Sequence, residues 1–189
     1  MLPRLRLPDG PVALSGETWL EIGFGGGEHL AEQAARHPEV TIIGAEPFLN
    51  GVASLLRHVD ERGLGNVRVH PDDVRDLLDR LPDAGLARVF ILFPDPWPKA
   101  RHNKRRLLQP DVVRTLVRVL RPGGRLRFAT DWENYAEEAL ERLLRTPGLA
   151  WMAEGADDWR TPPADHVATR YEAKRLGDIA PVFFDFVRR

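Results

Sequence analysis

Short apolar runs alternate along the chain with segments whose apolar side chains recur at helical spacing. Apolar runs bounded by turn residues predict strands, and the three-to-four-residue apolar period predicts helices. Because the two kinds of segment alternate, we expect a doubly wound α/β fold, with a mostly parallel seven-stranded sheet and helices on both faces. The predicted strands are 18–22, 40–43, 66–70, 87–93, 125–129, 147–153 and 181–187, and the predicted helices are 28–37, 48–62, 73–80, 110–120 and 132–145.

Residues 154–178 interrupt this alternation, because the segment is polar and shows neither period. A connection of that length inside a compact domain usually has a function of its own. The chain has 189 residues, which suits one domain with a substantial core. We therefore expect a single domain over residues 1–189, in which loop 154–178 contributes to substrate recognition.

Glycines mark the turn from the first predicted strand into the first predicted helix, in the sequence Glu21-Ile-Gly23-Phe-Gly25-Gly-Gly-Glu28. Glycine lets the backbone approach a ligand, although many such turns only pack a helix against a sheet. The spacing is G-x-G-x-G, and Glu28 stands where the dinucleotide fingerprint has its last glycine. Acids on both sides of the turn disfavour a diphosphate and favour a ligand of cationic character, such as S-adenosylmethionine. Glu28 itself is better explained as an acid that stabilises a helix N-terminus.

Acids also follow the second and third predicted strands. Glu46 lies 23 residues after Gly23, where a carboxylate can accept hydrogen bonds from both ribose hydroxyls of an adenosine cofactor. Asp72 is placed to contact the adenine amine or its surroundings, and Asp73 is an equally good candidate one residue on. Acids at successive strand ends favour a cofactor site over a turn that only packs.

The segment Pro94-Asp95-Pro-Trp97-Pro follows the buried strand predicted at 87–93. Open α/β sheets bind ligands at the carboxyl ends of their strands, and the prolines should make this turn stiff. Trp97 can stack on a base or pack beneath the turn, and His102 is a phosphate donor or a structural contact rather than a general base. The cations that come next predict phosphate contacts beside one carboxylate, and they are Lys99, Arg101, Lys104, Arg105 and Arg106.

Composition narrows the function further. The 27 Lys and Arg residues nearly balance the 28 Asp and Glu residues, so a basic footprint must be local. The absence of cysteine excludes disulfides, thiolate zinc sites and cysteine nucleophiles. The histidines and acids show no metal-ligand spacing, so we expect no metal. No window approaches the ~18 to 20 apolar residues of a membrane span, and the first residues lack the apolar stretch of a signal peptide, so we expect a soluble cytoplasmic protein without a membrane partner.

Four motifs together resemble a known family over nearly the whole chain. They are Glu21-Ile-Gly-Phe-Gly25, Pro94-Asp-Pro-Trp97 with the cations after it, Thr130-Asp-Trp-Glu-Asn-Tyr135, and Thr169-Arg-Tyr-Glu172. The chain resembles the bacterial tRNA (guanine-N7-)-methyltransferases, which are class I enzymes of Rossmann-like fold that depend on S-adenosylmethionine. The second motif is highly specific, whereas the first is generic to methyltransferases. The resemblance implies that the protein methylates N7 of a guanosine in the variable loop of tRNA, at position 46.

The resemblance also implies roles for individual residues. Asp95 is the catalytic residue, and Gly23 and Gly25 belong to the cofactor turn. The cofactor contacts are Glu21, Glu46, Asp72 and Asp95, and the substrate contacts are Lys99, Asp131, Thr169, Arg170, Tyr171 and Glu172.

The chemistry of the target atom favours one carboxylate over a base. Guanine N7 has an in-plane lone pair and no proton, so the enzyme mainly has to position the reactants. A fixed carboxylate can stabilise the positive charge that the purine gains, and Asp95 is the first candidate and Asp131 the second. Asp131 is also placed to cap the helix predicted at 132–145. Residues 169–172 suit nucleoside recognition, but a helix start would show similar residues.

Three other functions are compatible with parts of the sequence. An RNA-binding protein without catalysis would not need the glycine turn and the acids at the strand ends. An NAD-dependent oxidoreductase is disfavoured by the missing glycine at position 28. A small-molecule methyltransferase would have no use for five cations beside its catalytic turn. We therefore expect tRNA as the partner, and the sequence leaves a monomer and a homodimer both open.

Overall fold

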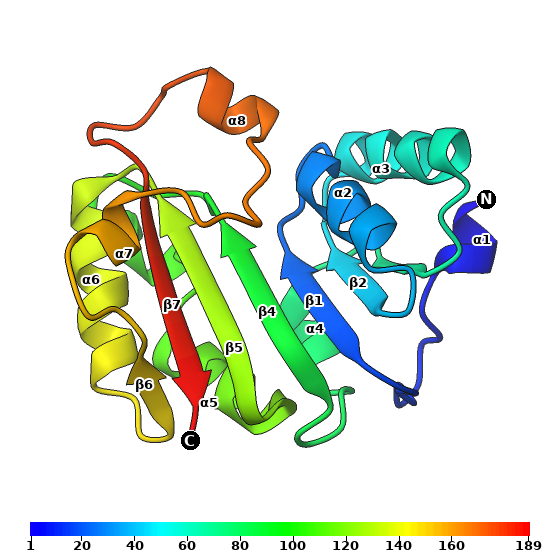
Figure 1. Cartoon of the computed structure of the whole chain (residues 1–189), viewed down its shortest axis with the longest axis horizontal. Helices are drawn as coiled ribbons and strands as arrows, with labels where there is room; N and C mark the ends of the chain where they lie inside the picture. The colour runs from blue at the N-terminus through cyan, green and yellow to red at the C-terminus, as the bar shows by residue number, and fades with distance from the viewer.

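A computed structural model describes residues 1–189 and contains one seven-stranded sheet in the order β3-β2-β1-β4-β5-β7-β6 (Figure 1). β7 runs antiparallel to both of its neighbours, whereas every other pair in the sheet is parallel. The predicted mostly parallel, seven-stranded sheet is therefore confirmed. The strands are β1 Thr18–Ile22, β2 Thr41–Ala45, β3 Val67–His70, β4 Leu86–Leu92, β5 Leu120–Thr130, β6 Leu149–Trp151 and β7 Val182–Arg188.

Helices connect the strands and cover both faces of the sheet, as the alternating pattern predicts. The sequence predicts the five α-helices that connect consecutive strands from β1 to β6, one of which has only five residues. Of the remaining helices, it leaves a helix start at 169–172 open and predicts none of the others, because no helical period marks these segments of four to six residues. None of the helices has the length and hydropathy that crossing a membrane requires. The helices are α1 Leu2–Leu5, α2 Glu28–Arg36, α3 Leu49–Arg62, α4 Val74–Leu78, the 3-10 helix η1 Ala100–Arg105, α5 Pro110–Val119, α6 Glu133–Leu144, α7 Asp157–Arg160 and α8 Arg170–Ala173.

Each face of the sheet has its own hydrophobic core. On one face, Leu77 of α4, Leu116 of α5 and Tyr135 of α6 are fully buried. On the other face, Leu30 of α2 and Leu55 of α3 are fully buried. Because the sheet is covered on both faces, its central strands are apolar almost throughout rather than alternating.

The order of the strands reverses between β1 and β4. From β1 the chain moves outward to β2 and β3, and it then returns to form β4 on the other side of β1. The segments that leave the carboxyl ends of these two strands diverge, and such a switch point leaves a crevice in which open α/β sheets bind ligands. The glycine turn follows β1 and the Pro94-Asp95 turn follows β4, so both motifs lie at this crevice.

Residues 154–178, which we call the strap, cross the part of the sheet that α2 and α3 leave uncovered (Figure 1). The carboxylate of Asp165 accepts a hydrogen bond from Arg127 of β5 at 2.5 Å and another from Arg88 of β4 at 2.9 Å. Arg127 also donates to Asp185 of β7 at 2.8 Å. The predicted loop is therefore fixed to β4 and β5 by half-buried ion pairs, and the same Arg127 connects β5 to β7.

Candidate active site

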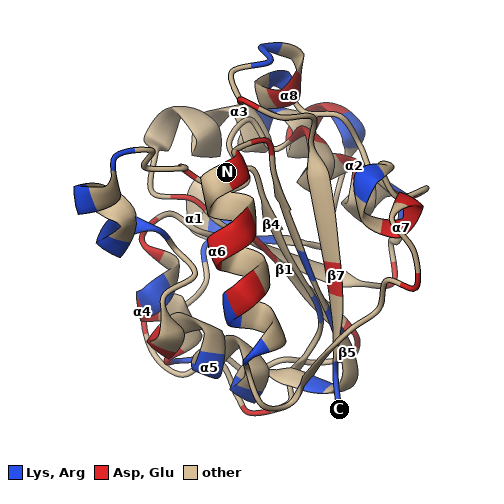
Figure 2. Cartoon of the chain, turned by 90° about the vertical axis from the view of Figure 1, so that its left-hand side faces the viewer, with Lys and Arg blue, Asp and Glu red and all other residues tan.

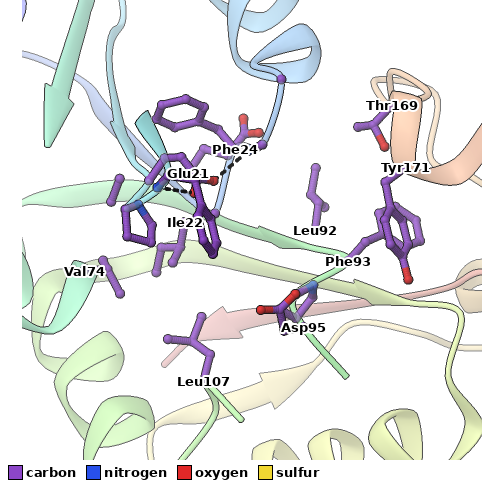
Figure 3. Close-up of a pocket in the computed structure, with 18 of the residues that line it drawn as sticks. Glu21, Ile22, Phe24, Val74, Leu92, Phe93, Asp95, Leu107, Thr169 and Tyr171 are labelled. Carbon is purple, nitrogen blue, oxygen red and sulfur yellow. Dashed lines mark hydrogen bonds between the residues drawn. The ribbon is translucent and has the colours of Figure 1, made fainter. Parts of the chain in front are cut away.

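A cavity of about 400 Å³ lies at the carboxyl ends of β1 and β4 (Figure 3). Its volume is in the range of small-molecule and cofactor sites. Its walls come from the glycine turn, the ends of β2 and β4, the start of α4, and α8 of the strap. The predicted site residues that line it are Glu21, Gly23, Gly25, Glu46, Asp95, Arg105, Thr169, Arg170 and Tyr171.

The glycine turn needs glycine at two positions for its backbone conformation. Gly23 has a φ of 71° and Gly25 a φ of 52°, in the left-handed region where other residues are strained. The amide of Gly25 donates a hydrogen bond to Glu46 Oε2 at 2.9 Å, which ties the turn to the end of β2. The turn thus exposes bare backbone to the cavity.

Two buried carboxylates face the same cavity. Glu21 at the end of β1 is 3% exposed, and its Oε2 lies 2.7 Å from Nδ1 of His29. Glu46 is 4% exposed, and it accepts hydrogen bonds from the amides of Gly25 and, at 3.0 Å, Phe48. Each oxygen of Glu46 keeps one lone pair, so this carboxylate can still accept a hydrogen bond from a hydroxyl group. Such a pair of acids suits a ligand that has a cationic group and hydroxyls.

Asp95 differs from these acids because its side chain is exposed at the edge of the cavity, between Leu107 and Tyr171 (Figure 3). Two features besides its prolines restrain the turn that carries Asp95. Trp97 has a φ of 43°, and the carbonyl of Pro96 accepts a hydrogen bond from Arg106 Nε at 2.9 Å. The structure therefore holds one solvent-accessible carboxylate in a fixed position beside the cavity.

Comparison with known proteins connects this geometry to a family. The family model described as "Putative methyltransferase" matches residues 15–183. The tRNA (guanine-N(7)-)-methyltransferase of Caulobacter vibrioides is 59% identical over 194 residues, which cover 100% of this chain and 85% of the relative. The protein of the same name from Hyphomonas neptunium is 54% identical over 97% of this chain and 86% of its own. This chain belongs to the tRNA (guanine-N7-)-methyltransferase family.

A solved structure supports the fold of this member of the tRNA (guanine-N7-)-methyltransferase family. An rRNA methylase from Streptococcus thermophilus superposes with a TM-score of 0.62 at 12% sequence identity, over 92% of this chain and 87% of the other. At that identity the similarity shows the fold alone, and it confirms the Rossmann-like class I architecture predicted from the resemblance.

The two acids after β3 are placed differently relative to the cavity. Asp73 lines the cavity, caps α4 by accepting a hydrogen bond from the amide of Arg75 at 2.9 Å, and pairs with the Arg75 guanidinium at 2.7 Å. Asp72 is exposed, does not line the cavity, and accepts a hydrogen bond from the amide of Asp73 at 2.8 Å. Of the two candidates, only Asp73 therefore lies at the cavity wall.

Arg106 differs from the other four cations that the sequence predicts as phosphate contacts. Arg106 is only 1% exposed. Its guanidinium donates hydrogen bonds to Pro96 O, Asn134 Oδ1 and the carboxylate of Glu138. The guanidinium also lies 4.7 Å from the ring of Tyr135. Because Arg106 is buried and each of its three guanidinium nitrogens donates to a protein group, its position is that of a structural anchor of the Asp95 turn rather than of an exposed phosphate contact.

The other four cations are exposed, on η1 and just before it. In Figure 2 a short helix with blue residues, at the left of the view, is separated from the red stretches of α6. Arg105 lies 4.8 Å above the ring of Trp97, and His102 packs edge-on against it at 5.8 Å. Trp97 lines the cavity and is half-buried, so packing beneath the turn accounts for only part of its surface. The exposed cations are Lys99, Arg101, Lys104 and Arg105.

Asp131 is placed differently from the predicted helix cap. Its side chain is 4% exposed and accepts hydrogen bonds from the amide of Gly177 at 3.1 Å and the hydroxyl of Tyr171 at 3.3 Å. The first helical amide of α6, on Glu133, instead donates to Asp178, the last residue of the strap, at 2.9 Å. Asp131 therefore connects β5 to the strap, and it does not line the cavity.

The motif at 169–172 is a helix start and a cavity wall at the same time. Thr169 and Glu172 form a capping box at the beginning of α8. Burial would raise the pKa of Glu172, but hydrogen bonds from His166 and from the Thr169 amide outweigh it and lower the pKa. Thr169, Arg170 and Tyr171 line the cavity, whereas Glu172 points away toward His166. Arg170 also pairs with Glu28 of α2 at 2.5 Å across the glycine turn.

Several residues that shape the site were missed in the sequence. His29 and Gln33 lie on the buried face of α2, and Arg127 and Asp165 hold the strap on the sheet. Burial would raise the pKa of Asp165, but Arg127 and Arg88 outweigh it and lower the pKa to about 2. One signal was present, because Arg127 is a charged residue inside an otherwise apolar strand, and such residues need a buried partner. No group of three or more His, Asp or Glu side chains is arranged to hold a metal ion.

Proposed function

We propose that this protein transfers a methyl group from S-adenosylmethionine to N7 of a guanosine in tRNA, and that the guanosine is position 46 of the variable loop. One juxtaposition carries the proposal. A single exposed carboxylate, Asp95, stands between a cavity lined by buried acids and a row of exposed cations on η1. The names of relatives that are up to 59% identical support the same reaction.

The cofactor would be held by the buried acids and the glycine turn. Glu21 offers a carboxylate to the ammonium group, and Glu46 offers lone pairs to the ribose hydroxyls. Asp73 and the backbone of α4 would border the base. When bound, S-adenosylmethionine supplies an electrophilic methyl group on a sulfonium. Glu28, which pairs with Arg170, places a carboxylate at the N-terminus of α2, where a diphosphate would otherwise bind.

Asp95 would be the catalytic carboxylate. N7 of guanine carries no proton, so no residue has to act as a base to create the nucleophile. A carboxylate fixed at the cavity edge can accept hydrogen bonds from N1 or the exocyclic amine of guanine and stabilise the charge that the ring acquires. The hydrogen bond from Arg106 to Pro96 holds the turn so that little reorganisation is needed during the reaction.

The substrate side of the site would be formed by η1 and the strap. Lys99, Arg101, Lys104 and Arg105 would contact phosphates, which supplies affinity and orientation without base specificity. Thr169 and Tyr171 would face the guanosine from α8 (Figure 3). Asp131 would act by holding Tyr171 through its hydroxyl. We further propose that residues 1–189 work as a single domain in the cytoplasm.

The deciding experiment is methyl transfer from labelled S-adenosylmethionine to unmodified tRNA transcripts, followed by digestion to nucleosides. We expect labelled 7-methylguanosine, and we expect none from a transcript whose guanosine 46 is replaced by adenosine. Labelled product from the replaced transcript would retain the reaction but refute the position. A protein that binds the cofactor but labels no tRNA would refute tRNA as the substrate.

A further inference from the structure

Glu21 receives a hydrogen bond from only one protein side chain. That side chain is His29 of α2, whose Nδ1 lies 2.7 Å from Glu21 Oε2. His29 is 1% exposed, and its ring packs edge-on against Phe90 at 5.0 Å. The other oxygen of Glu21 faces the cavity without a partner from the protein. The histidine therefore determines how the carboxylate is oriented.

The tautomer of His29 follows from the residue behind it. Gln33 Nε2 lies 2.7 Å from the carbonyl oxygen of Asp165 and 3.3 Å from His29 Nε2. A carbonyl oxygen only accepts hydrogen bonds, so the Gln33 atom that faces it must be the amide nitrogen. The second N–H of that nitrogen is then available to His29 Nε2, which must be the unprotonated acceptor. The proton of His29 is consequently on Nδ1, where it is donated to Glu21.

We propose that His29 is a positioning residue for Glu21, the protein carboxylate that would bind the cofactor. Gln33 holds His29 as a neutral Nδ1–H donor. A neutral donor orients Glu21 without cancelling its charge, whereas an imidazolium or a lysine would leave the carboxylate paired before a cationic ligand arrived. The inference rests on the proposed function, because the cationic group that Glu21 serves is the ammonium of S-adenosylmethionine. A second proton on His29 would place an Nε2–H donor against the Nε2–H donor of Gln33, and two donors cannot form a hydrogen bond with each other.

The same hydrogen-bonded row begins in the strap. Asp165 supplies the carbonyl that fixes Gln33, and its carboxylate is itself fixed by Arg127 and Arg88. The ion pairs that hold the strap on the sheet thus also hold the acceptor that sets the His29 tautomer. This arrangement explains why α2 buries two polar side chains, His29 and Gln33, where apolar side chains would be enough for packing.

The test compares two ligands that differ at the group Glu21 would bind. S-adenosylmethionine carries the ammonium, whereas 5′-methylthioadenosine keeps the adenosine and sulfur but lacks the amino-acid portion. In His29→Phe, which retains an aromatic ring against Phe90, we expect the Kd for S-adenosylmethionine measured by calorimetry to rise about tenfold or more, as for loss of a hydrogen bond to a charged group. The Kd for 5′-methylthioadenosine should stay within about twofold of wild type.

Two further variants separate positioning from general damage. His29→Asn places an amide nitrogen near the position of Nδ1, so it should recover most of the S-adenosylmethionine affinity. In a Glu21→Gln background, His29→Phe should cause little additional loss, because the two residues act through one contact. Equal weakening of both ligands, no recovery in His29→Asn, or additive losses in the double variant would overturn the inference. Wild-type protein that does not bind S-adenosylmethionine would overturn the proposed function itself, and the inference with it.

Discussion

At the scale of single residues, exposure separates acids that the sequence treats alike. Glu21 and Glu46 are buried with protein hydrogen bonds to their carboxylates, whereas Asp95 is exposed at the cavity edge. Buried acids can hold a ligand that stays in place, and an exposed acid can meet a substrate that arrives from solvent. This division supports the proposal that Glu21 and Glu46 hold the cofactor and that Asp95 meets the guanosine.

We predict that Asp95→Asn lowers kcat for tRNA methylation by about 100-fold or more, the scale of removing one transition-state-stabilising group. The asparagine keeps the shape and one acceptor but loses the charge. The measurement is single-turnover methyl transfer at saturating tRNA, with the exposed Glu61→Gln on α3 as a matched acid-to-amide control that should match wild type. Wild-type turnover in Asp95→Asn would exclude a charge-based role.

Two neighbouring cations should separate stability from binding. Arg106→Ala leaves Glu138 and Asn134 without their buried partner, so we expect the free energy of unfolding to fall by about 3 kcal/mol. Lys104→Ala, at an exposed position, should change that free energy by less than about 0.5 kcal/mol. Urea denaturation checks both. An Arg106→Ala protein of normal stability that has lost tRNA affinity would mean that Arg106 contacts RNA after all.

At the scale of elements, the strap is the least predictable part and the part that completes the site. Its α8 supplies one wall of the cavity, and its Asp165 is fixed to β4 and β5 by arginines. Gly177 lies so close to Asp131 that a Cβ there would come within 2.1 Å of the Asp131 backbone oxygen. The strap is therefore seated against the end of β5 as well as against the sheet face.

The ion pairs of the strap should make stability depend on pH in a defined direction. The folded-state pKa of Asp165 is about 2, below the ordinary value of about 3.9. A lowered pKa stabilises the fold above the unfolded value, and this contribution is lost as the pH falls from about 5 toward 2. We therefore expect the stability difference between wild type and Asp165→Asn to shrink between pH 5 and pH 3. The exposed Asp157→Asn on α7 should show no such pH-dependent difference in urea unfolding.

At the scale of the whole molecule, the two surfaces that we propose bind the cofactor and the tRNA meet at one end of the sheet. The cofactor cavity is lined by buried acids, and η1 beside it carries exposed cations. The chain as a whole has a net charge of only −1, so its attraction for RNA must come from this local surface. Affinity for tRNA and affinity for the cofactor should then respond differently to salt.

We expect tRNA affinity to fall steeply with salt and cofactor affinity to change little. Each phosphate contact contributes about 0.7 to 0.9 to the slope of log K against log salt concentration, so Lys99→Ala/Lys104→Ala should reduce that slope by about 1.5. The matched control is Arg121→Ala/Arg145→Ala, which removes two exposed cations at the opposite end of the sheet. Filter binding over a salt series measures both. A slope equal to that of wild type in the first variant would place the phosphates elsewhere.

The sequence by itself determined the sheet, the five α-helices that connect β1 to β6 in turn, and most of the cavity acids. These features are encoded locally, because apolar periodicity sets the strands and helices, and strand ends followed by glycine or acid set the crevice. The family resemblance depended on the same local motifs. Asp73 stood among the alternatives because adjacent acids at a strand end cannot be separated without knowing which one caps the next helix.

Only the tertiary structure decided which polar side chains face a ligand and which face one another. Arg106 looked like its exposed neighbours until Glu138, 32 residues away, was seen to bind it. Asp131 looked like a helix cap, but Gly177, 46 residues away, occupies its carboxylate. The tautomer of His29 depends on Asp165, to which it is joined only through Gln33. Hydrogen-bond partners so distant along the chain show no fixed spacing in the sequence, because the packing of the whole sheet brings them together.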